Sequence, residues 1–322
     1  MDFFHMNTYY PTVDIVVCAH NNKKVTARCL DSLLSLSYPN FKIILVDDCS
    51  TDDSVVFLRD KYPTVTIIEN EKNFGAAKTR SNGIKSGNAE YVVTMDNDAT
   101  LSPDWLTKMV KLMESDEKIG QAGGKILSFN NPKIIAEAGV SMSFRGRGYP
   151  IGEGRLASDD KYNKERKVLS ISTASMIVRR KILNKIGGFC DAYYYGYEDT
   201  DLSLMINIAG YKVIYYPEAV SYHMLSTTVS QTIGKKRVYY WMRNRLLIMF
   251  RSYELKNLFR YLPANLRFTA GDCFHHPERI MPVLLGWLWI IFHLPNIIIQ
   301  RRKINNFRKV RDSQLHRLFN SD

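Results

Sequence analysis

Two carboxylates stand two positions apart directly after an apolar run. Asp96 and Asp98 follow "EYVVTM", whose length and composition are typical of a buried strand. Like charges this close repel each other, and they keep their charge most easily when a cation lies between them. A helix cap is the alternative, because an acidic residue or a threonine before "LSPDWLTKMVKLM" suits the start of a helix. The pair therefore indicates a metal site or a cap.

Polar residues also follow two other predicted strands. "HNN" begins at His20 after the first strand, and "DDCSTDD" includes Asp48 at the end of the second. In open parallel sheets, ligands bind outside the carboxyl ends of the strands. We therefore expect three loops to converge on one ligand at a single edge of the sheet, which unrelated helix caps would not require.

The elements that must position these residues alternate in type along the chain. Short apolar runs are separated by segments with helical periodicity, which predicts a largely parallel α/β sheet flanked by helices. Strands are predicted at residues 14–19, 42–48, 65–70 and 91–96. The pattern is irregular from 120 to 180, although a buried strand is predicted at 168–180.

The irregular region contains a stretch rich in Gly and Arg at residues 144–155, "FRGRGYPIGEGR". A stretch of this composition is interpreted either as a mobile flap near a ligand or as a disordered connection.

A second group of acidic residues stands at the predicted start of a helix. Glu198, Asp199 and Asp201 precede an apolar helical face, and Gly210 ends this helix before a strand at 212–216. Acidic residues are common in a first helical turn because they compensate the helix dipole. Taken alone, this pattern indicates only where the helix begins.

Composition and cysteine use are those of an ordinary globular protein. The 322 residues are 45% hydrophobic and 24% charged, and their number predicts two domains or one large domain with an appendage. Five scattered cysteines without a metal-ligand spacing argue against a disulfide framework and for a reducing cytoplasm. The N-terminal residues lack the apolar core of a signal peptide, so we expect no export.

The net charge of +12 belongs entirely to the C-terminal part. Residues 235–322 hold 17 basic and 5 acidic residues, whereas residues 1–234 hold 27 of each. Such an excess indicates an anionic partner or a solvated tail. We therefore predict two parts, a first domain at 1–234 that contains the candidate site and a basic, apolar helical region at 235–322.

An apolar run at residues 280–299 follows a segment in which aromatic and basic residues interleave. The run has the length of a membrane span, about 20 residues. His293, Pro282 and Pro295 weaken that interpretation, so an embedded hairpin or an interfacial helix on an anionic membrane surface is preferred over a full span. The alternative is an apolar helix that packs against the first domain or a second subunit.

Several ordered stretches together carry a resemblance to a known family. They are "VVCAHNN", "ILVDDCSTDDS", "NFGAAKTRSNGI", "MDNDA", "GGF", "YEDTDLSLMINIAGYKV" and "YPEAVSYH". Over roughly residues 12–225, their order and spacing resemble the family-2 glycosyltransferases, whose nucleotide-diphospho-sugar transferase fold is called GT-A. Sub-patterns also resemble bacterial rhamnosyl- and galactofuranosyl-type transferases of surface polysaccharide assembly. The resemblance implies an α/β GT-A fold with a mostly parallel central sheet, to which a C-terminal helical, membrane-associating part is added.

The resemblance implies a metal site at the first pair of carboxylates. Asp96 and Asp98 match the family's DxD motif, which binds a divalent cation and the ribose of the nucleotide. His223 in "SYH" matches a third metal ligand of some members, and an ordinary histidine after a strand is the alternative. Hard oxygen ligands favour Mg²⁺ or Mn²⁺, so one of these ions is the expected cofactor.

The second group of acidic residues gains roles from the same resemblance. Asp199 matches the general base, which takes the proton of the acceptor hydroxyl on the side of the sugar opposite the leaving diphosphate. Direct attack of this kind inverts the anomeric centre. Glu198 and Asp201 are expected to support the base or to bind acceptor, and a helix start is the alternative.

The remaining residues are expected to contact the donor. Asp48 matches the residue that accepts a hydrogen bond from the nucleobase, and His20 stands where the family often stacks a side chain on the base. Arg80 can reach the diphosphate through charge-assisted hydrogen bonds. The alternatives are turn formation for Asp48, ordinary exposure for His20 and a solvated helical arginine for Arg80.

We therefore predict an inverting, metal-dependent glycosyltransferase. It moves a hexosyl, deoxyhexosyl or galactofuranosyl group from a nucleotide-diphosphate sugar to a glycan or lipid-linked acceptor in surface polysaccharide synthesis. It is expected on the cytoplasmic face of the cell membrane, bound peripherally or monotopically. A basic nucleic-acid-binding protein and a catalytically silent nucleotide-binding scaffold are the alternatives. Nucleic-acid binding leaves the acidic motifs unexplained, so no nucleic-acid partner is expected.

Overall fold

The computed structural model describes residues 9–224 and 236–319. The first four long strands are parallel and lie side by side in the order β4-β1-β2-β3. They are β1 (Val13–Ala19), β2 (Phe41–Asp47), β3 (Thr66–Glu69) and β4 (Tyr91–Asp96). The four strands predicted from the sequence are thus confirmed.

Three helices connect these strands, as the sequence predicts. They are α1 (Lys23–Leu34), α2 (Ser54–Lys61) and α3 (Ala76–Ser86). Strand β1 lies between β4 and β2, so the chain adds strands outward from β1 and then returns to its other side. Such a reversal of strand order opens a crevice at the carboxyl ends of the two strands on either side of it, here β1 and β4.

The second half of the sheet mixes strand directions. Strand β11 (Ser175–Arg179) runs antiparallel to both β4 and β6 (Ile119–Ser128), and β12 (Lys212–His223) runs parallel to β6. The short strands β5 (Ala99–Leu101), β7 (Ile135–Glu137) and β10 (Arg166–Lys167) pair with β12 or β6. The strand predicted at 168–180 is therefore shorter than expected, and the one predicted at 212–216 is longer.

The stretch rich in Gly and Arg forms a β-hairpin. Strand β8 (Val140–Met142) pairs with β9 (Gly148–Pro150), so the interpretation of this stretch as a disordered connection is wrong. Gly146 in the turn has a φ of 81°, and a Cβ there would lie 2.8 Å from Cγ of Arg245. Glycine is needed at this position because its backbone is left-handed and packs directly on another helix.

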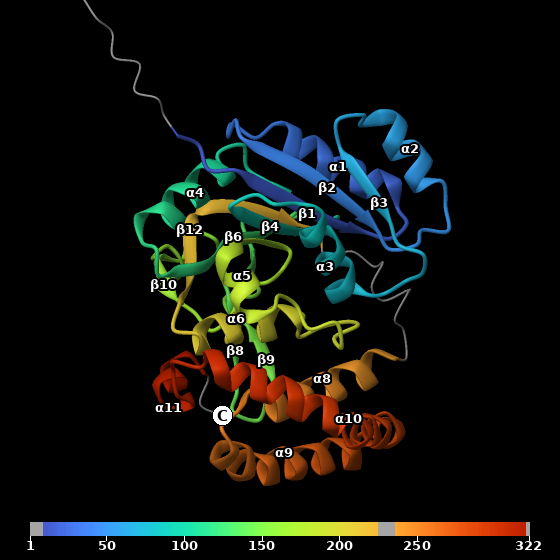
Figure 1. Ribbon diagram of the computed structural model, residues 1–322, viewed down its shortest axis with the longest axis vertical. Coiled ribbons are helices and arrows are strands. Elements are labelled where there is room, and N and C mark those ends of the chain that lie inside the picture. The colour runs from blue at the N-terminus through green and yellow to red at the C-terminus, as the bar shows by residue number, and fades with distance from the viewer. Residues whose placement is uncertain (1–8, 225–235, 320–322) are drawn as a thin grey trace, which may run out of the picture.

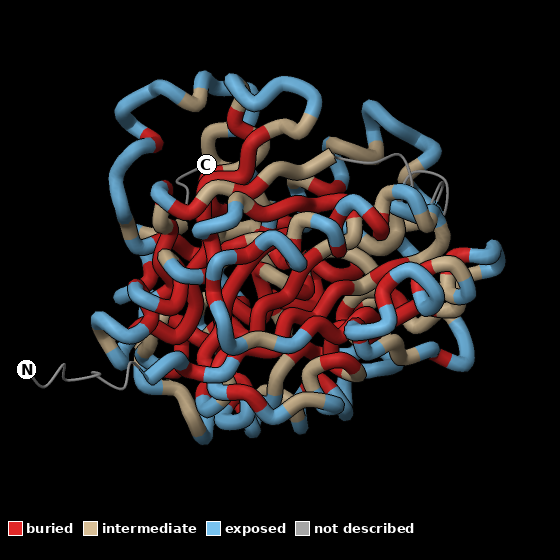
Figure 2. Tube along the Cα trace, turned by 90° about the horizontal axis from the view of Figure 1, so that it is seen from above, coloured by how far each residue is buried: buried red, intermediate tan, exposed pale blue. Residues whose placement is uncertain are grey.

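The core lies on both faces of the sheet, and alternate residues of β1 belong to different sides. Ile15 and Val17 pack with residues of α1 and α4 (Trp105–Ser115), whereas Val16 packs with the cluster that includes α5 (Arg180–Ile186) and α6 (Glu198–Ile208). Figure 2 shows the buried residues gathered along the central strands, with exposed residues around them. A sheet covered on both faces explains why its strands read as continuous apolar runs.

Three long helices follow at one end of the molecule, away from β1–β3 (Figure 1). They are α8 (Lys236–Ser252), α9 (Leu255–His275) and α10 (Ile280–Phe307), and the short α11 (Asp312–Leu315) follows them. Leu246–Met249 of α8 and Ile290, Ile297 and Ile304 of α10 share one hydrophobic cluster with residues of α6. The predicted domain boundary at 234 lies outside the described residues, and the division stays a prediction.

Candidate active site

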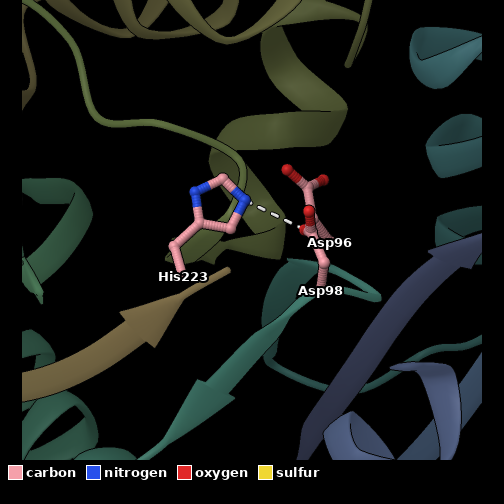
Figure 3. Close-up of side chains that lie close together, drawn as sticks. All are labelled: Asp96, Asp98 and His223. Carbon is pink, nitrogen blue, oxygen red and sulfur yellow. Dashed lines mark hydrogen bonds and ion pairs between the residues drawn. The ribbon is translucent and has the colours of Figure 1, made fainter. Parts of the chain in front are cut away.

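Asp96, Asp98 and His223 come together at the edge of the sheet (Figure 3). Their nearest carboxylate and imidazole atoms all lie within 4.8 Å of one another, and His223 Nε2 lies 2.9 Å from Asp98 Oδ1. Asp96 is the last residue of β4, and His223 is the last residue of β12. The two positions are 127 residues apart in the chain, and the tertiary structure makes them neighbours.

Backbone pairing explains how His223 reaches the two aspartates. After Asp96 the chain turns into β5, which pairs antiparallel with the end of β12 so that His223 lies opposite Ala99. The amide of Met224 also donates to the carbonyl of Asp98, at 2.9 Å. These ladder bonds hold the turn and the end of β12 in one register, which brings the three side chains together.

The three side chains fit a hard divalent cation. Two carboxylates and one imidazole supply oxygen and nitrogen ligands, and a cation bound at about 2.1 Å requires its ligands to lie roughly 3–4 Å apart. The observed spacing of up to 4.8 Å needs only small side-chain rotations to reach that range. Burial lowers the pKa of His223, but the hydrogen bond and negative charge of Asp98 outweigh it, and the net shift is upward. The imidazole therefore lies in a strongly negative field, which attracts a cation.

Arg80 lies between the metal-site candidates and the second acidic group. Its guanidinium forms ion pairs with Asp96 and, at 3.1 Å, with Glu198 Oε1. Arg80 is only 2% exposed, so the alternative of a solvated helical arginine is wrong. Burial lowers the pKa of Arg80, but the charges of the facing carboxylates raise it by a larger amount. The net shift is upward, so the guanidinium stays charged. The predicted contact of Arg80 with a diphosphate stays a prediction.

Asp199 stands in the first turn of α6, as the sequence predicts. Its Oδ1 accepts hydrogen bonds from the Thr200 amide at 2.6 Å and from the Thr200 hydroxyl at 3.1 Å. Burial raises the pKa of Asp199, and the negative charge of Asp96 raises it as well. The hydrogen bonds from Thr200 and the positive charge of Arg80 lower it, and the net shift is upward. A carboxylate with a raised pKa is a better proton acceptor, which suits a general base.

The neighbouring acidic residues face different partners. Burial also raises the pKa of Glu198, with the charge of Arg80 opposing it. Asp201 is 1% exposed, accepts a hydrogen bond from the Tyr193 hydroxyl at 3.2 Å and forms an ion pair with Arg251 of α8. Asp201 thus connects α6 to α8. The roles of Glu198 and Asp201 toward the base or an acceptor stay predictions.

Asp48 and His20 lie together where β1 and β2 end. The Asp48 carboxylate accepts from the amides of Phe74 and Gly75, at 2.8 and 2.9 Å, and from the side chain of Asn70, at 2.9 Å. His20 Nδ1 lies 3.0 Å from the carbonyl oxygen of Asp48. These bonds hold the "NFG" loop against β2, and a carboxylate with about four lone-pair sites retains room for one more donor. The roles of both residues toward a nucleobase stay predictions.

Sequence reasoning missed the buried Asn244 of α8. Its side-chain amide donates to the carbonyl oxygens of Tyr195 and Gly196, at 2.8 and 2.7 Å. Gly196 and Tyr197 both have left-handed backbones, with φ of 76° and 72°, and directly precede Glu198. Asn244 therefore holds the turn that aims the first residues of α6. Nothing in the sequence marks it except its place between two arginines in a helix of interleaved basic, aromatic and aliphatic residues.

Comparison with known proteins agrees with this geometry. The profile described as Glycosyl transferase family 2 matches residues 14–187, more than half of the chain. The chain belongs to this family. The match includes the DxD motif and ends before the helix that carries Asp199.

Solved structures of other proteins share the fold of this family-2 member. Mannosyltransferase PcManGT from Pyrobaculum calidifontis, in complex with GDP-Man and Mn²⁺, has a TM-score of 0.58 and 17% identity over 93% of this chain and 86% of its own. GalNAc-T7 with UDP, GalNAc and Mn²⁺ has a TM-score of 0.62 and 15% identity over 77% of this chain and 49% of its own. These likenesses confirm the predicted GT-A fold.

Two curated relatives are longer than this family-2 chain. The probable glycosyltransferase YdaM of Bacillus subtilis is 26% identical over 220 residues, which are 66% of this chain and 50% of YdaM. The O-antigen biosynthesis protein RfbC of Myxococcus xanthus is 25% identical over 280 residues, 83% of this chain and 21% of RfbC. The chain thus spans half the length of these relatives or less.

Proposed function

We propose that this protein is a metal-dependent, inverting glycosyltransferase that uses a nucleotide-diphosphate sugar and takes part in surface polysaccharide assembly. The observation that carries the proposal is the meeting of Asp96, Asp98 and His223 beside the Arg80–Glu198 ion pair. Family membership and the name of RfbC support the same assignment. Relatives of known structure were solved with UDP or GDP-Man and Mn²⁺, which supports this class of donor.

The donor binds in the crevice at the carboxyl ends of β1 and β4. Mg²⁺ or Mn²⁺ at the three ligands supplies positive charge for the diphosphate that departs with the electrons of the anomeric bond. Asp48 and His20 face the nucleoside end, where the loops after β1 and β2 are tied together by hydrogen bonds. Arg80 neutralises Asp96 and Glu198 on the same edge, which reduces repulsion of a polyanionic substrate.

Asp199 is the general base in this proposal. It accepts the proton of an acceptor hydroxyl as the oxygen attacks the anomeric carbon from the side opposite the diphosphate, so the configuration inverts. Glu198 and Asp201 fix the first turn of α6 through their ion pairs with Arg80 and Arg251. The acceptor is a glycan or a lipid-linked glycan.

Residues 235–322 attach this enzyme to the cytoplasmic face of the membrane. Among the described residues, one helix is long and apolar enough to cross a membrane, Pro277–Phe307, and only 22% of its most apolar window is buried. Gly286, Ile290, Ile297 and Ile304 face inward, whereas large apolar side chains on the other sides are exposed. A core helix would bury these side chains, so we place them in the lipid interface beside the basic residues of this region.

The decisive experiment compares Asp199→Asn with wild type. Purified full-length protein in detergent is incubated with a panel of nucleotide sugars and Mn²⁺, and donor binding, nucleotide release and the anomeric configuration of the product are measured. The amide keeps the shape of the side chain but cannot take the proton, so transfer falls by about 10²–10⁴-fold while donor binding stays within roughly twofold. Asp104→Asn, at the exposed start of α4, is the matched control.

Three results would count against the proposal. Near-normal transfer by Asp199→Asn would move the base to another residue, with Glu198 as the first candidate. Activity that survives complete chelation would remove the metal from the mechanism. Binding of RNA that nuclease treatment abolishes, without any binding of nucleotide sugars, would instead favour the nucleic-acid alternative.

A further inference from the structure

Three arginines surround one aromatic ring between the β8–β9 hairpin and helices α8 and α9. The guanidinium carbons of Arg145, Arg147 and Arg245 lie 6.0, 5.9 and 5.4 Å from the ring centre of Phe268. Cation–π contact of this kind stabilises each charge only modestly. The like charges of Arg147 and Arg245 repel each other, so this pair of side chains gains stability from an anion.

Arg245 is the buried member of this cluster. It is 5% exposed, its Nη2 donates to the Thr269 hydroxyl at 2.8 Å, and its Nε has no hydrogen-bond partner. Burial lowers the pKa of Arg245; the charges of Tyr197 and Asp272 oppose this shift, the charge of Arg147 adds to it, and the net shift is downward. Within the described ranges neither Arg147 nor Arg245 forms an ion pair, and the nearby Asp272 pairs with Arg279 at 2.6 Å. A buried guanidinium N–H without a partner is costly, which indicates a missing acceptor.

The surrounding backbone is arranged to hold the arginines in place. Gly146 packs on Arg245 closely enough that a Cβ would meet it at 2.8 Å. Asn265 of α9 donates to the carbonyl oxygen of Arg145 at 2.7 Å, and its own exposure is 1%. The hairpin is thus fixed to α8 and α9 by its main chain, and the side chain of Arg147 is exposed at its surface.

The cluster lies next to the segment that carries the proposed base. The amide of Gly148 donates to the Tyr197 hydroxyl at 3.4 Å, and Tyr197 directly precedes Glu198. Burial raises the pKa of Tyr197, and the positive charges of Arg245 and Arg147 oppose that rise. On its other side the cluster adjoins α9, whose Phe259 and Leu266 are 71% and 45% exposed.

We propose that Arg147 and Arg245 bind the phosphate or diphosphate ester that joins a lipid carrier to the acceptor sugar. Guanidinium groups bind phosphate oxygens through paired, charge-assisted hydrogen bonds. A phosphate here lies between the apolar surface of α9, which suits the lipid chain, and the turn before Asp199, which suits the sugar. This inference rests on the proposed function and narrows the acceptor to a phosphate-linked lipid.

The test measures how strongly the full-length protein prefers a lipid phosphate to the matching alcohol. Binding of farnesyl phosphate and of farnesol is measured in detergent with chelator present, so that the site at Asp98 cannot hold phosphate through a metal. Wild type binds the phosphate at least tenfold more tightly than the alcohol. Arg147→Ala and Arg245→Met each reduce that ratio about tenfold, as expected for one charge-assisted contact. Arg260→Ala, an exposed arginine on α9, leaves the ratio unchanged.

Each contrary result has a defined meaning. An equal loss of the phosphate-to-alcohol binding ratio in Arg260→Ala shows that general positive charge attracts the lipid. No preference of the wild type for the phosphate over the alcohol shows that no phosphate site exists. Either result overturns the inference. Equally tight binding of phosphatidylglycerol shows a membrane headgroup site and overturns the acceptor assignment. Because Arg147 is exposed, its variant remains informative even if Arg245→Met fails to fold. Donor binding with Mn²⁺ in the same preparation reports separately on the proposed function.

Discussion

The ion pair between Arg251 and Asp201 joins α8 to the helix that carries the proposed base. Its side chains are only 8% and 1% exposed, and Arg251 Nε also donates to Gln300 of α10 at 2.7 Å. Removing one partner of a buried pair leaves an uncompensated charge, which costs about 3–5 kcal/mol. We therefore expect Arg251→Met, which keeps most of the side-chain volume, to lower the free energy of unfolding by that amount.

A double-mutant cycle measures the pair itself. Asp201→Asn and Arg251→Met are made singly and together, and the free energy of unfolding is taken from urea titrations in detergent. The double variant is expected to lose less stability than the sum of the single variants, with a coupling energy of about 2–3 kcal/mol. Arg59→Met is the control. Arg59 forms an ion pair with Glu69, and their side chains are 58% and 52% exposed, so this pair should contribute less than about 1 kcal/mol.

Three outcomes would refute this reasoning. A loss in Arg251→Met no larger than in Arg59→Met would mean that water or another group compensates Asp201. Additive effects in the cycle would mean that the two side chains do not interact. If Asp201→Asn instead keeps full stability but loses acceptor binding, Asp201 contacts the acceptor rather than α8.

Three further predictions concern the turn before the base, the metal and the membrane. Asn244→Ala is expected to lower turnover at least tenfold with donor binding unchanged, because two carbonyls of the turn lose their hydrogen-bond donor. An equal loss of turnover and of donor binding would contradict a positioning role. Asp98→Ala should weaken Mn²⁺-dependent donor binding more than His223→Ala, since a carboxylate contributes charge as well as a ligand atom, and calorimetry checks the order. Phe292→Glu, on the outer surface of α10, should reduce flotation with anionic vesicles, whereas Val56→Glu on exposed α2 should not.

Local patterns in the sequence were enough to predict the first half of the fold. Strands β1, β2 and β4 are largely apolar runs, and a buried strand has this composition wherever the chain places it, whereas no residue of the edge strand β3 is buried. The convergence of polar loops also followed, because the carboxyl ends of parallel strands share an edge. The DxD pair and the start of α6 are local features, so the places of Asp96, Asp98 and Asp199 could be predicted from the sequence, while the role of Asp199 came from the family resemblance.

The sequence carried less information about the irregular region. The hairpin of β8 and β9 has three residues in each strand, too few for a clear alternation, and its glycines resemble a linker. It is ordered because Gly146 and Arg145 are fixed by residues of α8 and α9, more than 95 positions later in the chain.

Only the tertiary structure decided which charges meet. The helical pattern around Arg80 allowed either a solvated side chain or one that binds phosphate. Its burial between Asp96 and Glu198 depends on three elements that pack around it. Asp201 likewise pairs with Arg251, 50 residues away, because α8 packs on α6. A carboxylate or guanidinium has no local preference for a particular partner, so its pairing is set by the packing of the apolar faces that carry it.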